Sequence, residues 1–562
     1  MLKTVDGAPG ALTPMTTLQL DPRDNVLVAL TDLKAGDAVQ HAGSNITLQT
    51  DVDAKHKFPI QPLKAGDKVT MYGVLVGTVS DDVPAGTLLH THNLHHAADP
   101  FGINLYQEGA FEWLTTPDIS QFVGRTFQGF HRENGTVGTA NYWIVIPMVF
   151  CENRNLRMLQ NALLKPLGYA KSGKYEDFAE RLAAATAAGQ DISEVTFESS
   201  ESQTANRLFP NVDGIKFLSH SMGCGSDRGD SDSLCRLLAG YATHPNVAGV
   251  TVLSLGCQHA QVSILEDEIK KRCPQFDRPL QIFEQQAYPS EEVLLEDAMR
   301  QMLAGLATAN KQSRQPAPIT KLSVGMECGG SDGFSGISAN PAIGHVTDVL
   351  TALGARAVLS EFPELCGVEA DLIKRCKTST EAKRFIQLME DYNARAEAIG
   401  SGFSMNPSPG NIKDGLITDA IKSAGAAKKG GTAPVSDVLD YTEPLRRDGF
   451  SLVCTPGNDV ESTTAMTGSG CNVILFSTGL GTPTGNPVCP VIKVASNTKT
   501  ALRHPDLIDY NAGTIIEGKE SIAEAGNRLL EMILDVASGS YTTKAVGLGQ
   551  DDFIPWRRGV SL

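Results

Sequence analysis

Residues 324–341, VGMECGGSDGFSGISANP, combine glycines with side chains that transfer protons or bind oxygen atoms. From Glu327 to Ser335 this stretch offers two carboxylates, one thiol and two hydroxyls. Glycines let backbone amides come close to a ligand, although glycine punctuation alone also marks an ordinary turn with solvated side chains. We predict that the loop binds the oxygen atoms of a small molecule. The predicted binding residues are Cys328, Gly329, Gly330, Ser331, Asp332, Ser335 and Asn340.

Four histidines lie within seven residues at 90–96, HTHNLHH. We expect residues 87–94 to form a strand, which would place His90 and His92 on one face because side chains at i and i+2 point the same way. Two neutral imidazoles suit a divalent transition metal, and one of them could instead act as a base. A polar strand end with solvated histidines is the alternative. We predict that His90 and His92 are catalytic residues and metal ligands.

Carboxylates also follow a predicted strand at 355–360, in the sequence SEFPE at 360–364. The end of a strand is a place where general acid or base chemistry is possible. A capping or loop role is the alternative. We predict that Glu361 and Glu364 are catalytic.

Two cationic side chains are further candidates for substrate binding. Arg132 lies in a polar turn, and a guanidinium can bind a carboxylate through two parallel hydrogen bonds. Lys413 is a polar tip of the rigid segment NPSPGNIKDG at 406–415. An exposed side chain without a ligand is the alternative for Arg132.

Eleven cysteines are scattered through the chain, and five of them adjoin glycine. This spacing does not indicate a disulfide framework and fits a reducing compartment, so we expect a cytoplasmic protein. Cys224 and Cys257 follow predicted strands at 215–219 and 250–254, and we predict that they are metal ligands. A [4Fe–4S] cluster on Cys224, Cys257 and Cys328 is the alternative, because cluster ligands can come from separate loops.

The elements that would position these groups are α/β units. A strand at 322–326, the glycine loop and a helix at 341–353, with Asn340 as its N-cap, lead to the strand at 355–360. A parallel βαβ unit has its loop at the carboxyl end of the sheet, where binding sites collect. A second βαβ unit spans 215–254. We therefore predict a multi-lobed α/β body.

The N-terminal part has a different pattern. Residues 14–98 contain short β-branched runs between glycine turns, among them a strand expected at 69–79, which predicts an all-β domain. The segment LKAGDAV at 33–39 returns as LKAGDKV at 63–69, which indicates an internal duplication. We divide the rest into a connector at 99–125, a first α/β lobe at 126–308 with a surface helix at 175–188, a linker at 309–318 and a C-terminal α/β lobe at 319–562.

Size and charge restrict the class of protein. The 562 residues are too many for one hydrophobic core. No apolar run approaches the ~20 residues needed to cross a bilayer, and the first residues, MLKTVDG, lack the apolar core of a signal peptide. A net charge of −16 argues against nucleic acid or a membrane as a partner, because both need a basic surface. A small anionic metabolite needs only a few local cations.

The motifs of the chain, taken in order, resemble the altronate dehydratase and galactarate dehydratase family. The order is kept from near residue 20 to the C-terminus. The motifs are HTHN (90–93), HSMGCG (220–225), HPNV (244–247), LGC (255–257), ECGGSDGFSGISANP (327–341), SEFPE (360–364) and NPSPGN (406–411).

This resemblance implies a small N-terminal SAF, or β-clip, domain on a larger α/β body. It also implies a sugar-acid hydro-lyase that depends on a divalent metal, Fe²⁺ or Mn²⁺. We expect the protein to be a homo-oligomer. The arrangement looks closest to altronate dehydratases, which implies conversion of D-altronate to 2-dehydro-3-deoxy-D-gluconate in hexuronate catabolism. Galactarate dehydratase, sulfolactate sulfo-lyase and a non-catalytic sugar-acid sensor are the alternatives.

Two features depart from the pattern of the family. Where the family often has Gly-Val-Arg-Asn, residues 138–141 read GTAN, so an expected arginine is missing. The insertion at 170–210 is also unusual for the family. The first departure puts a clamp role for that arginine in doubt, and the second could alter assembly or access to the pocket.

Overall fold

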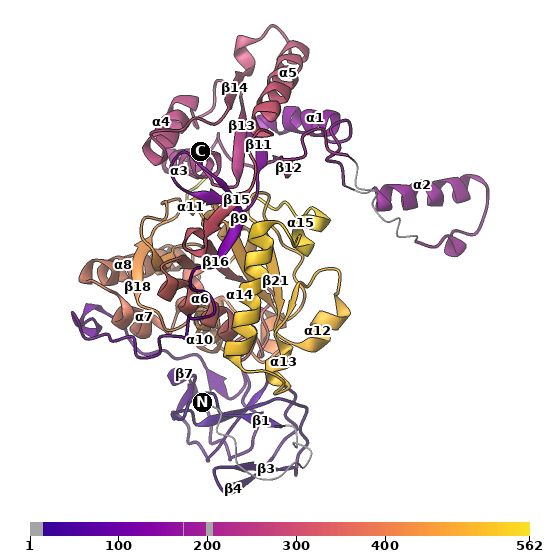
Figure 1. Ribbon diagram of the computed structural model, residues 1–562. Coiled ribbons are helices and arrows are strands. Elements are labelled where there is room, and N and C mark those ends of the chain that lie inside the picture. The colour runs from indigo at the N-terminus through magenta and orange to yellow at the C-terminus, as the bar shows by residue number, and fades with distance from the viewer. Residues whose placement is uncertain (1–14, 172, 198–205) are drawn as a thin grey trace.

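A computed structural model describes residues 15–171, 173–197 and 206–562. Figure 1 shows an N-terminal β domain at the foot, a large sheet with its helices in the middle, and a smaller α/β lobe at the top. The segment MLKTVDG, residue 14 of the predicted β domain, and residues 172 and 198–205 of the insertion lie outside the described residues. Within the described ranges, no helix has the length and apolar character to cross a membrane.

The N-terminal domain is all β, as predicted, and its strands pair in small antiparallel sheets. The strand predicted at 69–79 is a hairpin of two strands, because Tyr72 (φ 57°) and Gly73 (φ 75°) turn the chain. The strands are β1 (Thr17–Leu18), β2 (Val26–Ala29), β3 (Ala38–His41), β4 (Ser44–Thr47), β5 (Lys57–Pro59), β6 (Lys68–Met71), β7 (Val74–Val79) and β8 (Leu94–His95).

The two repeated segments fold in the same way, which confirms the internal duplication. Lys34 Nζ pairs with Asp51 at 2.8 Å in the first copy, and Lys64 Nζ pairs with Asp82 at 2.7 Å in the second. The backbone amide after each lysine donates to the same aspartate. Each copy then leads into a hairpin, β3–β4 or β6–β7.

The first α/β lobe contains β9 (Thr126–His131), β10 (Val137–Gly138), β11 (Tyr142–Pro147), α1 (Asn153–Leu163), α2 (Lys174–Ala187), β12 (Gly214–Phe217), α3 (Arg228–Ala242), β13 (Val247–Ser254), α4 (Val262–Arg272), β14 (Leu280–Glu284), α5 (Glu291–Ala309) and β15 (Gln315–Pro318). Its main sheet is parallel, in the order β12-β11-β13-β14. The stretch 309–318, predicted to be a linker, includes β15. This strand pairs antiparallel with β9 of the same lobe.

The C-terminal lobe contains β16 (Ser323–Cys328), α6 (Ala339–Leu353), β17 (Arg356–Leu359), α7 (Glu369–Arg375), α8 (Ser379–Ala398), α9 (Pro409–Lys413), α10 (Asp419–Ala427), β18 (Val435–Leu439), β19 (Gly449–Val453), α11 (Asp459–Ser469), β20 (Val473–Thr478), β21 (Val491–Ala495), α12 (Thr498–Arg503), β22 (Tyr510–Asn511), α13 (Gly513–Ile516), α14 (Ile522–Ser538) and α15 (Lys544–Leu548). In the described part of the chain its sheet has seven strands, all parallel, in the order β18-β19-β17-β16-β20-β21-β22.

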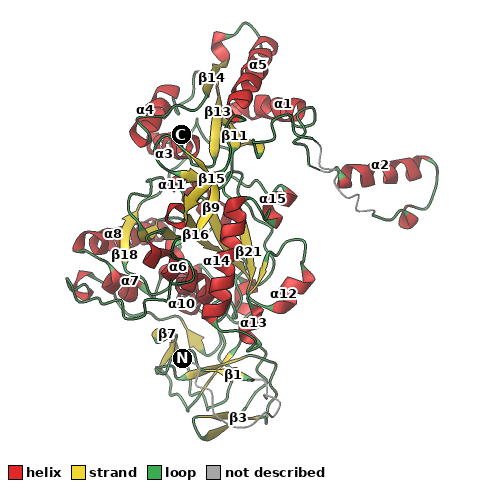
Figure 2. Ribbon diagram, in the orientation of Figure 1, coloured by secondary structure: helices red, strands yellow, loops and turns green. Residues whose placement is uncertain are grey.

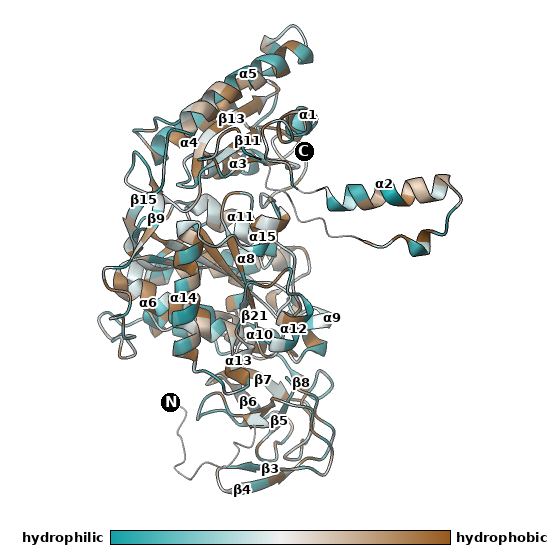
Figure 3. Ribbon diagram, turned by 45° about the vertical axis from the view of Figure 1, so that its right-hand side comes forward, coloured by the Kyte–Doolittle hydropathy of each residue, from teal (hydrophilic) through white to brown (hydrophobic). Residues whose placement is uncertain are grey.

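Helices cover both faces of this central sheet (Figure 2). One apolar layer includes Val346 of α6 and Leu529 of α14, and the other includes Met466 of α11 and Ala545 of α15. The covering helix α14 carries hydrophilic and hydrophobic residues side by side, as expected for a helix with one face on the sheet (Figure 3). Burial on both faces explains why the strands are nearly continuous apolar runs.

The helix after the glycine loop begins earlier than predicted. It starts at Ala339, so Asn340 is in its first turn and the predicted N-cap role is wrong. Asn340 instead donates to the carbonyl of Gly425 and accepts from the hydroxyl of Ser477. The helix ends at Gly354 with φ 82°, as the sequence predicts.

Candidate active site

The glycine loop leaves the carboxyl end of β16 and crosses the edge of the central sheet. A Cβ atom at Gly329 would lie 2.0 Å from Oδ2 of Asp459, and Gly330 has φ 60°. A side chain would collide at the first position, and the second has a conformation that favours glycine. The two glycines therefore let the backbone pass directly against a carboxylate.

Cys328, Glu361 and Glu364 meet beside this loop. Sγ of Cys328 lies 3.0 Å from Oε2 of Glu364 and 3.5 Å from Oε2 of Glu361. The backbone N–H of Cys328 also donates to Glu361 at 3.3 Å. Each of the three residues is at most 3% exposed. The structure therefore brings together three of the predicted site residues in a buried position.

Glu327, Glu361 and Asp459 form a second group, in which one carboxylate oxygen of each lies within 4.8 Å of the others. Oε2 of Glu327 accepts a hydrogen bond from Ser462 at 2.6 Å. Among the described residues, neither Oε1 of Glu327 nor Oε1 of Glu361 has a hydrogen-bond partner. Because buried polar atoms are normally paired, these two oxygens indicate a place for a cation or a proton.

Two lysines form ion pairs with carboxylates of this cluster. Lys429, in the 3₁₀ helix η8 (Lys428–Gly430), lies 3.2 Å from Oε2 of Glu361. Lys422 of α10 lies 2.6 Å from Oε1 of Glu364. Burial tends to lower the pKa of both amines, but the nearby acids outweigh it and raise both pKa values. Both lysines are therefore charged at neutral pH.

Lys493 differs from these two lysines. It lies in β21, and its Nζ is 3.7 Å from the centroid of the Phe476 ring. Nζ has no hydrogen-bond partner within the described ranges. Burial lowers the pKa of Lys493 to about 7, against the attraction of Asp459. At neutral pH this amine therefore supplies only part of a positive charge.

The carboxyl groups of the cluster differ in pKa. Burial raises the pKa of Glu361 to about 7, with Glu364 adding to the rise and Lys429 opposing it. Burial and the neighbouring Glu361 also raise the pKa of Glu327 well above its usual value. Burial acts in the same direction on Glu364, but Lys422 and Lys429 outweigh it, so the pKa of Glu364 lies below its usual value. Glu364 is thus ionised at neutral pH beside two carboxyl groups that retain protons more readily.

The backbone of Glu361 is strained. Its φ of 63° and ψ of 61° lie in the left-handed region, which a residue with a Cβ rarely adopts. The N–H of Glu361 donates to Oγ1 of Thr455 at 2.8 Å, which helps to hold this conformation. Such strain costs ~1–3 kcal/mol and is concentrated at functional sites. The strain therefore favours a functional role for Glu361.

Most other residues of the glycine loop hold the loop together. Oδ1 of Asp332 accepts hydrogen bonds from Ser335 and from Ser496, at 2.9 and 2.8 Å. The carbonyl of Ser331 accepts a hydrogen bond from the Asn411 amide at 2.9 Å. These polar contacts lie within the protein, so Ser331, Asp332 and Ser335 shape the loop.

The N-terminal domain docks on this same edge of the sheet. Nζ of Lys55 lies 3.1 Å from Asp332 and 2.7 Å from Asp414. Nε2 of His56 lies 3.1 Å from the carbonyl oxygen of Lys413, whose side chain is exposed. The domain therefore brings residues 55–56 against the glycine loop and the segment that carries Lys413.

The predicted strand around His90 and His92 is wrong. The N–H of His90 donates to Oδ1 of Asn93 at 2.8 Å, which closes a turn before β8. The rings nevertheless stack in a row with His56, with centroids 5.7 Å apart for His56 and His90 and 6.1 Å for His90 and His92. Burial, with His92 adding to it, lowers the pKa of His90 and favours the neutral ring. The two imidazoles are therefore neighbours, but through a turn and not through a strand.

Arg132 is placed where it cannot clamp a substrate carboxylate at this edge. It is buried in the first lobe, where Nε donates to the carbonyl of Pro245 at 2.6 Å and Nη2 donates to Oδ1 of Asn141 at 2.9 Å. Nη1 donates to Gln312, so all three nitrogens that a bidentate clamp could use already have partners within the protein. The structure contradicts the predicted clamp, because a turn sequence does not reveal that the side chain points inward.

The predicted thiol ligands are also separated. Cys224 and Cys257 follow β12 and β13 in the upper lobe, whereas Cys328 ends β16 in the central sheet (Figure 1). In the described part of the chain, no group of three metal-ligating side chains within 4.8 Å includes Cys224 or Cys257. The structure therefore assembles neither the predicted metal set nor the alternative [4Fe–4S] set.

Each part of the chain matches a family of known proteins. Residues 15–97 match the altronate/galactarate dehydratase SAF domain, residues 129–310 match the D-galactarate dehydratase/altronate hydrolase second domain, and residues 319–561 match the D-galactarate/altronate dehydratase C-terminal domain. The chain is 31% identical to the altronate dehydratase of Escherichia coli (strain K12), over 94% of this chain and 96% of that protein. It belongs to the altronate/galactarate dehydratase family.

Other relatives agree with this family. The altronate dehydratase of Bacillus subtilis (strain 168) is 31% identical over 93% of this chain and 95% of its own length. The galactarate dehydratase (L-threo-forming) of E. coli is 36% identical over 55% of this chain and 60% of its own length. The predicted SAF domain, the α/β body and the hydro-lyase class are thereby confirmed.

A cavity lies at the opposite edge of this dehydratase's central sheet. It has a volume of about 350 Å³ and is lined by Ser323 and Arg356, which begin β16 and β17, by Asn472, which precedes β20, and by Arg272 of the first lobe. Ligands of parallel sheets bind at the carboxyl ends of the strands. The carboxylate cluster, and not this cavity, is therefore the candidate active site of the dehydratase.

The lysines near the carboxylate cluster of this dehydratase were not predicted as site residues from the sequence. Lys493 had a usable signal, because a lysine inside the apolar strand VIKVA must be buried and is costly without a nearby acid. Lys422 and Lys429 had none, since each looks like a surface residue of a helix. Asp459 looked like an ordinary acid at a helix N-terminus.

Proposed function

We propose that this dehydratase removes water from D-altronate to give 2-dehydro-3-deoxy-D-gluconate, a step of hexuronate catabolism. The observation that carries the proposal is the buried cluster of Glu327, Cys328, Glu361 and Glu364 at the carboxyl edge of the central sheet. The 31% identity to two altronate dehydratases, over 93–94% of this chain, supports D-altronate as the substrate.

Dehydration of a 2,3-dihydroxy acid makes three demands on the protein. A base must take the C2 proton, an acid must protonate the departing C3 hydroxyl, and the negative charge that develops on the carboxylate must be stabilised. A positioned acid or base contributes about 10²–10⁴-fold each. Because C2 is a weak carbon acid, electrostatic stabilisation must supply the larger share.

We propose Glu364 as the proton acceptor. It is ionised at neutral pH, and Lys422 at 2.6 Å and the Cys328 thiol at 3.0 Å fix its two oxygens. His92, on the SAF side, is proposed to protonate the departing hydroxyl, with the neutral ring of His90 stacked beside it. The enol product then tautomerises to the 2-keto acid.

The cluster also fits the divalent metal, Fe²⁺ or Mn²⁺, that the family resemblance implies. Oε1 of Glu327 and Oε1 of Glu361 are buried and unpaired among the described residues. The carboxylates of Glu327, Glu361 and Asp459 together form an all-oxygen donor set that suits these ions. Glu327, Glu361 and Asp459 would hold the ion, which would stabilise the charge on the substrate carboxylate. His90 and His92 fit a shared ion less well, because their rings are stacked with centroids 6.1 Å apart.

The test is a substrate panel on reconstituted protein. Metal-depleted protein is reconstituted singly with Fe²⁺, Mn²⁺ or Zn²⁺ and assayed for 2-keto acid from hexonates and hexarates. We expect the highest turnover with D-altronate and Fe²⁺ or Mn²⁺. Faster turnover of galactarate, or sulfite release from sulfolactate, would assign the alternative activities of the family. Failure to turn over any of these acids would favour a sugar-acid sensor.

We also propose that the dehydratase is a cytoplasmic homo-oligomer that binds neither nucleic acid nor membranes. The net charge of −16 supports the second part. Light scattering on the purified full chain tests the assembly, and a monomer would contradict it.

A further inference from the structure

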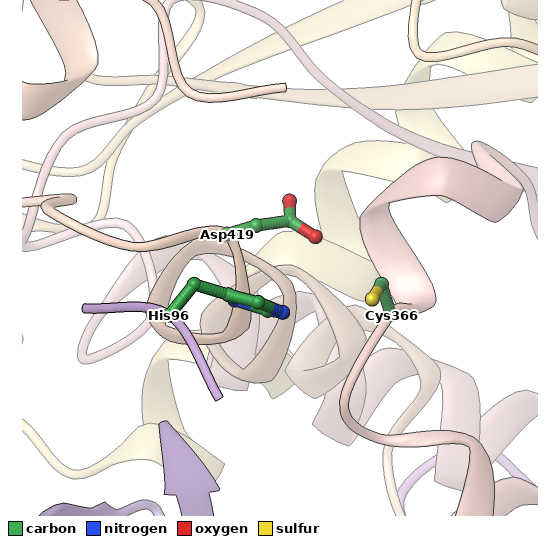
Figure 4. A group of neighbouring side chains, drawn as sticks. All are labelled: His96, Cys366 and Asp419. Atoms are coloured by element: carbon green, nitrogen blue, oxygen red, sulfur yellow. The ribbon is translucent and has the colours of Figure 1, made fainter. Parts of the chain in front are cut away.

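Three potential metal ligands from separate segments meet where the SAF domain docks on the body (Figure 4). His96 follows β8 of the SAF domain, Cys366 follows the short helix η6 (Phe362–Leu365), and Asp419 is the first residue of α10. One ligand atom of each residue lies within 4.8 Å of the other two. The proposed dehydration uses none of these side chains.

The backbone around this group is closely packed. A Cβ atom at Gly367, which has φ 91°, would lie 3.2 Å from Cβ of Ala420 and 3.5 Å from Cβ of Ala98. Oγ1 of Thr418 donates to the carbonyl of Val76 in the SAF domain at 2.9 Å. These contacts hold the three segments together without any ligand, so the side chains are preorganised.

Asp419 is the member that needs a partner. It is 1% exposed, and within the described ranges neither of its carboxylate oxygens accepts a hydrogen bond of ordinary geometry. Burial raises the pKa of Asp419 to about 8, although the nearby Cys366 thiol opposes the rise. A buried carboxylate without compensation is costly. The carboxylate and the thiol face the same space, with the His96 ring beside them (Figure 4).

We propose that His96, Cys366 and Asp419 bind a divalent cation of the zinc class. Imidazole nitrogen, thiolate sulfur and carboxylate oxygen are the ligand types that Zn²⁺ takes, and three protein ligands leave a fourth position for water. The donor set is softer than the all-oxygen group of Glu327, Glu361 and Asp459. The two sites therefore prefer different metals.

Binding at this site releases protons. The thiol of Cys366 must become a thiolate to bind a metal. The N–H of Ala420 lies 3.3 Å from Nδ1 of His96, which is long for a hydrogen bond, so a cation can take that lone pair at small cost. A cation at Nε2 would instead move the ring proton to Nδ1. In both cases the affinity falls as the pH is lowered, because the thiol of Cys366 must lose its proton.

A cation at this site would hold in place the two segments that carry the ion pair of Glu364 and Lys422. Lys422 lies three residues after Asp419 on α10, and Cys366 lies two residues after Glu364. The ion would therefore tie the end of the last SAF strand to the segments that carry both charges. This is a positioning role, and the side chains of the site do not contact the reacting atoms.

The first test is Co²⁺ binding to the full chain after removal of metals with a chelator. Thiolate ligation gives a sulfur-to-cobalt charge-transfer band in the near ultraviolet. Because Cys328 also lies among carboxylates, the two thiols are replaced separately. We expect the band to persist in Cys328→Ser and to fall in Cys366→Ser. Cys257→Ser, which removes an exposed thiol of the other lobe, is the matched control and should leave the band unchanged.

The second test is Zn²⁺ affinity, measured by competition with a chromophoric chelator. His96→Ala and Asp419→Asn should each weaken Zn²⁺ binding by about 10–100-fold or more. His95→Ala, at the exposed neighbouring residue, should leave it unchanged. Asp419→Asn keeps the shape and removes the buried charge, so we expect it to fold. Zn²⁺ should raise the melting temperature of the natural chain but not of this variant.

An unchanged cobalt band in Cys366→Ser, or an unchanged Zn²⁺ affinity in Asp419→Asn, would overturn the proposal. Both readouts are independent of turnover. The absence of D-altronate dehydration would therefore defeat the proposed function and leave this metal site standing.

Discussion

Replacing Lys429 with methionine tests the electrostatics of the buried cluster. Nζ of Lys429 lies 3.2 Å from Oε2 of Glu361, and each side chain is 1% exposed. Methionine fills similar space but leaves the carboxyl group without its cation. Removing one partner of a buried ion pair typically costs ~3–5 kcal/mol. We expect a loss of this size in the free energy of unfolding of metal-depleted protein, measured by urea denaturation at pH 8.

The loss should depend on pH. Burial raises the pKa of Glu361 to about 7, from an ordinary value of 4.5 in the unfolded chain. The stability that this carboxyl group contributes is therefore present at low pH and is lost as the pH rises through about 7. The difference of 2.5 pKa units corresponds to ~3 kcal/mol. Lys429 limits this loss by lowering the pKa, so the deficit of Lys429→Met should be smaller at pH 5 than at pH 8.

Two further variants give this prediction its controls. Lys383→Met, at an exposed position of α8, should change the free energy of unfolding by no more than ~0.5 kcal/mol. Adding Glu361→Gln to Lys429→Met should recover most of the loss, because a neutral amide needs no cation. A loss below ~1 kcal/mol at pH 8, or a loss that does not vary with pH, would refute the reasoning.

Two other substitutions test the geometry of the site. Gly329→Ala places a Cβ 2.0 Å from Oδ2 of Asp459 and should weaken Mn²⁺ binding by about 10–100-fold, measured by calorimetry. Gly547→Ala, where no described atom lies within 4 Å of the new Cβ, should bind Mn²⁺ normally, and equal affinities would contradict the proposed metal site. His92→Ala should lower D-altronate turnover by about 10²–10⁴-fold without changing the melting temperature. His95→Ala is its control, and a near-normal rate for His92→Ala would remove that residue from the mechanism.

The fold was predictable where the signal is local. The glycine loop, the helix stop at Gly354 and the repeated LKAGD turns each depend on a few consecutive residues, and the structure has all three. The run 69–79 looked like one strand because its residues are mostly β-branched. The turn depends on a positive φ at Tyr72, which side-chain composition does not indicate.

The site was predictable only for residues that end a strand or lie in the glycine loop. Glu361 and Cys328 belong to such segments, and they meet in the structure. The cation of Glu361 is 68 residues away along the chain, so no spacing rule finds it. The prediction for Arg132 was wrong for the same reason, because the carbonyl of Pro245 that accepts from it is 113 residues away along the chain.

The most direct test of the buried cluster as the reaction centre is D-altronate turnover by metal-loaded Glu364→Gln. Lys422 keeps a hydrogen bond to Asn406 in this variant, so the substitution should not leave the lysine without a partner. We expect kcat to fall by about 10²–10⁴-fold while Mn²⁺ binding is retained. A variant that turns over D-altronate within about tenfold of the natural rate would contradict Glu364 as the proton acceptor.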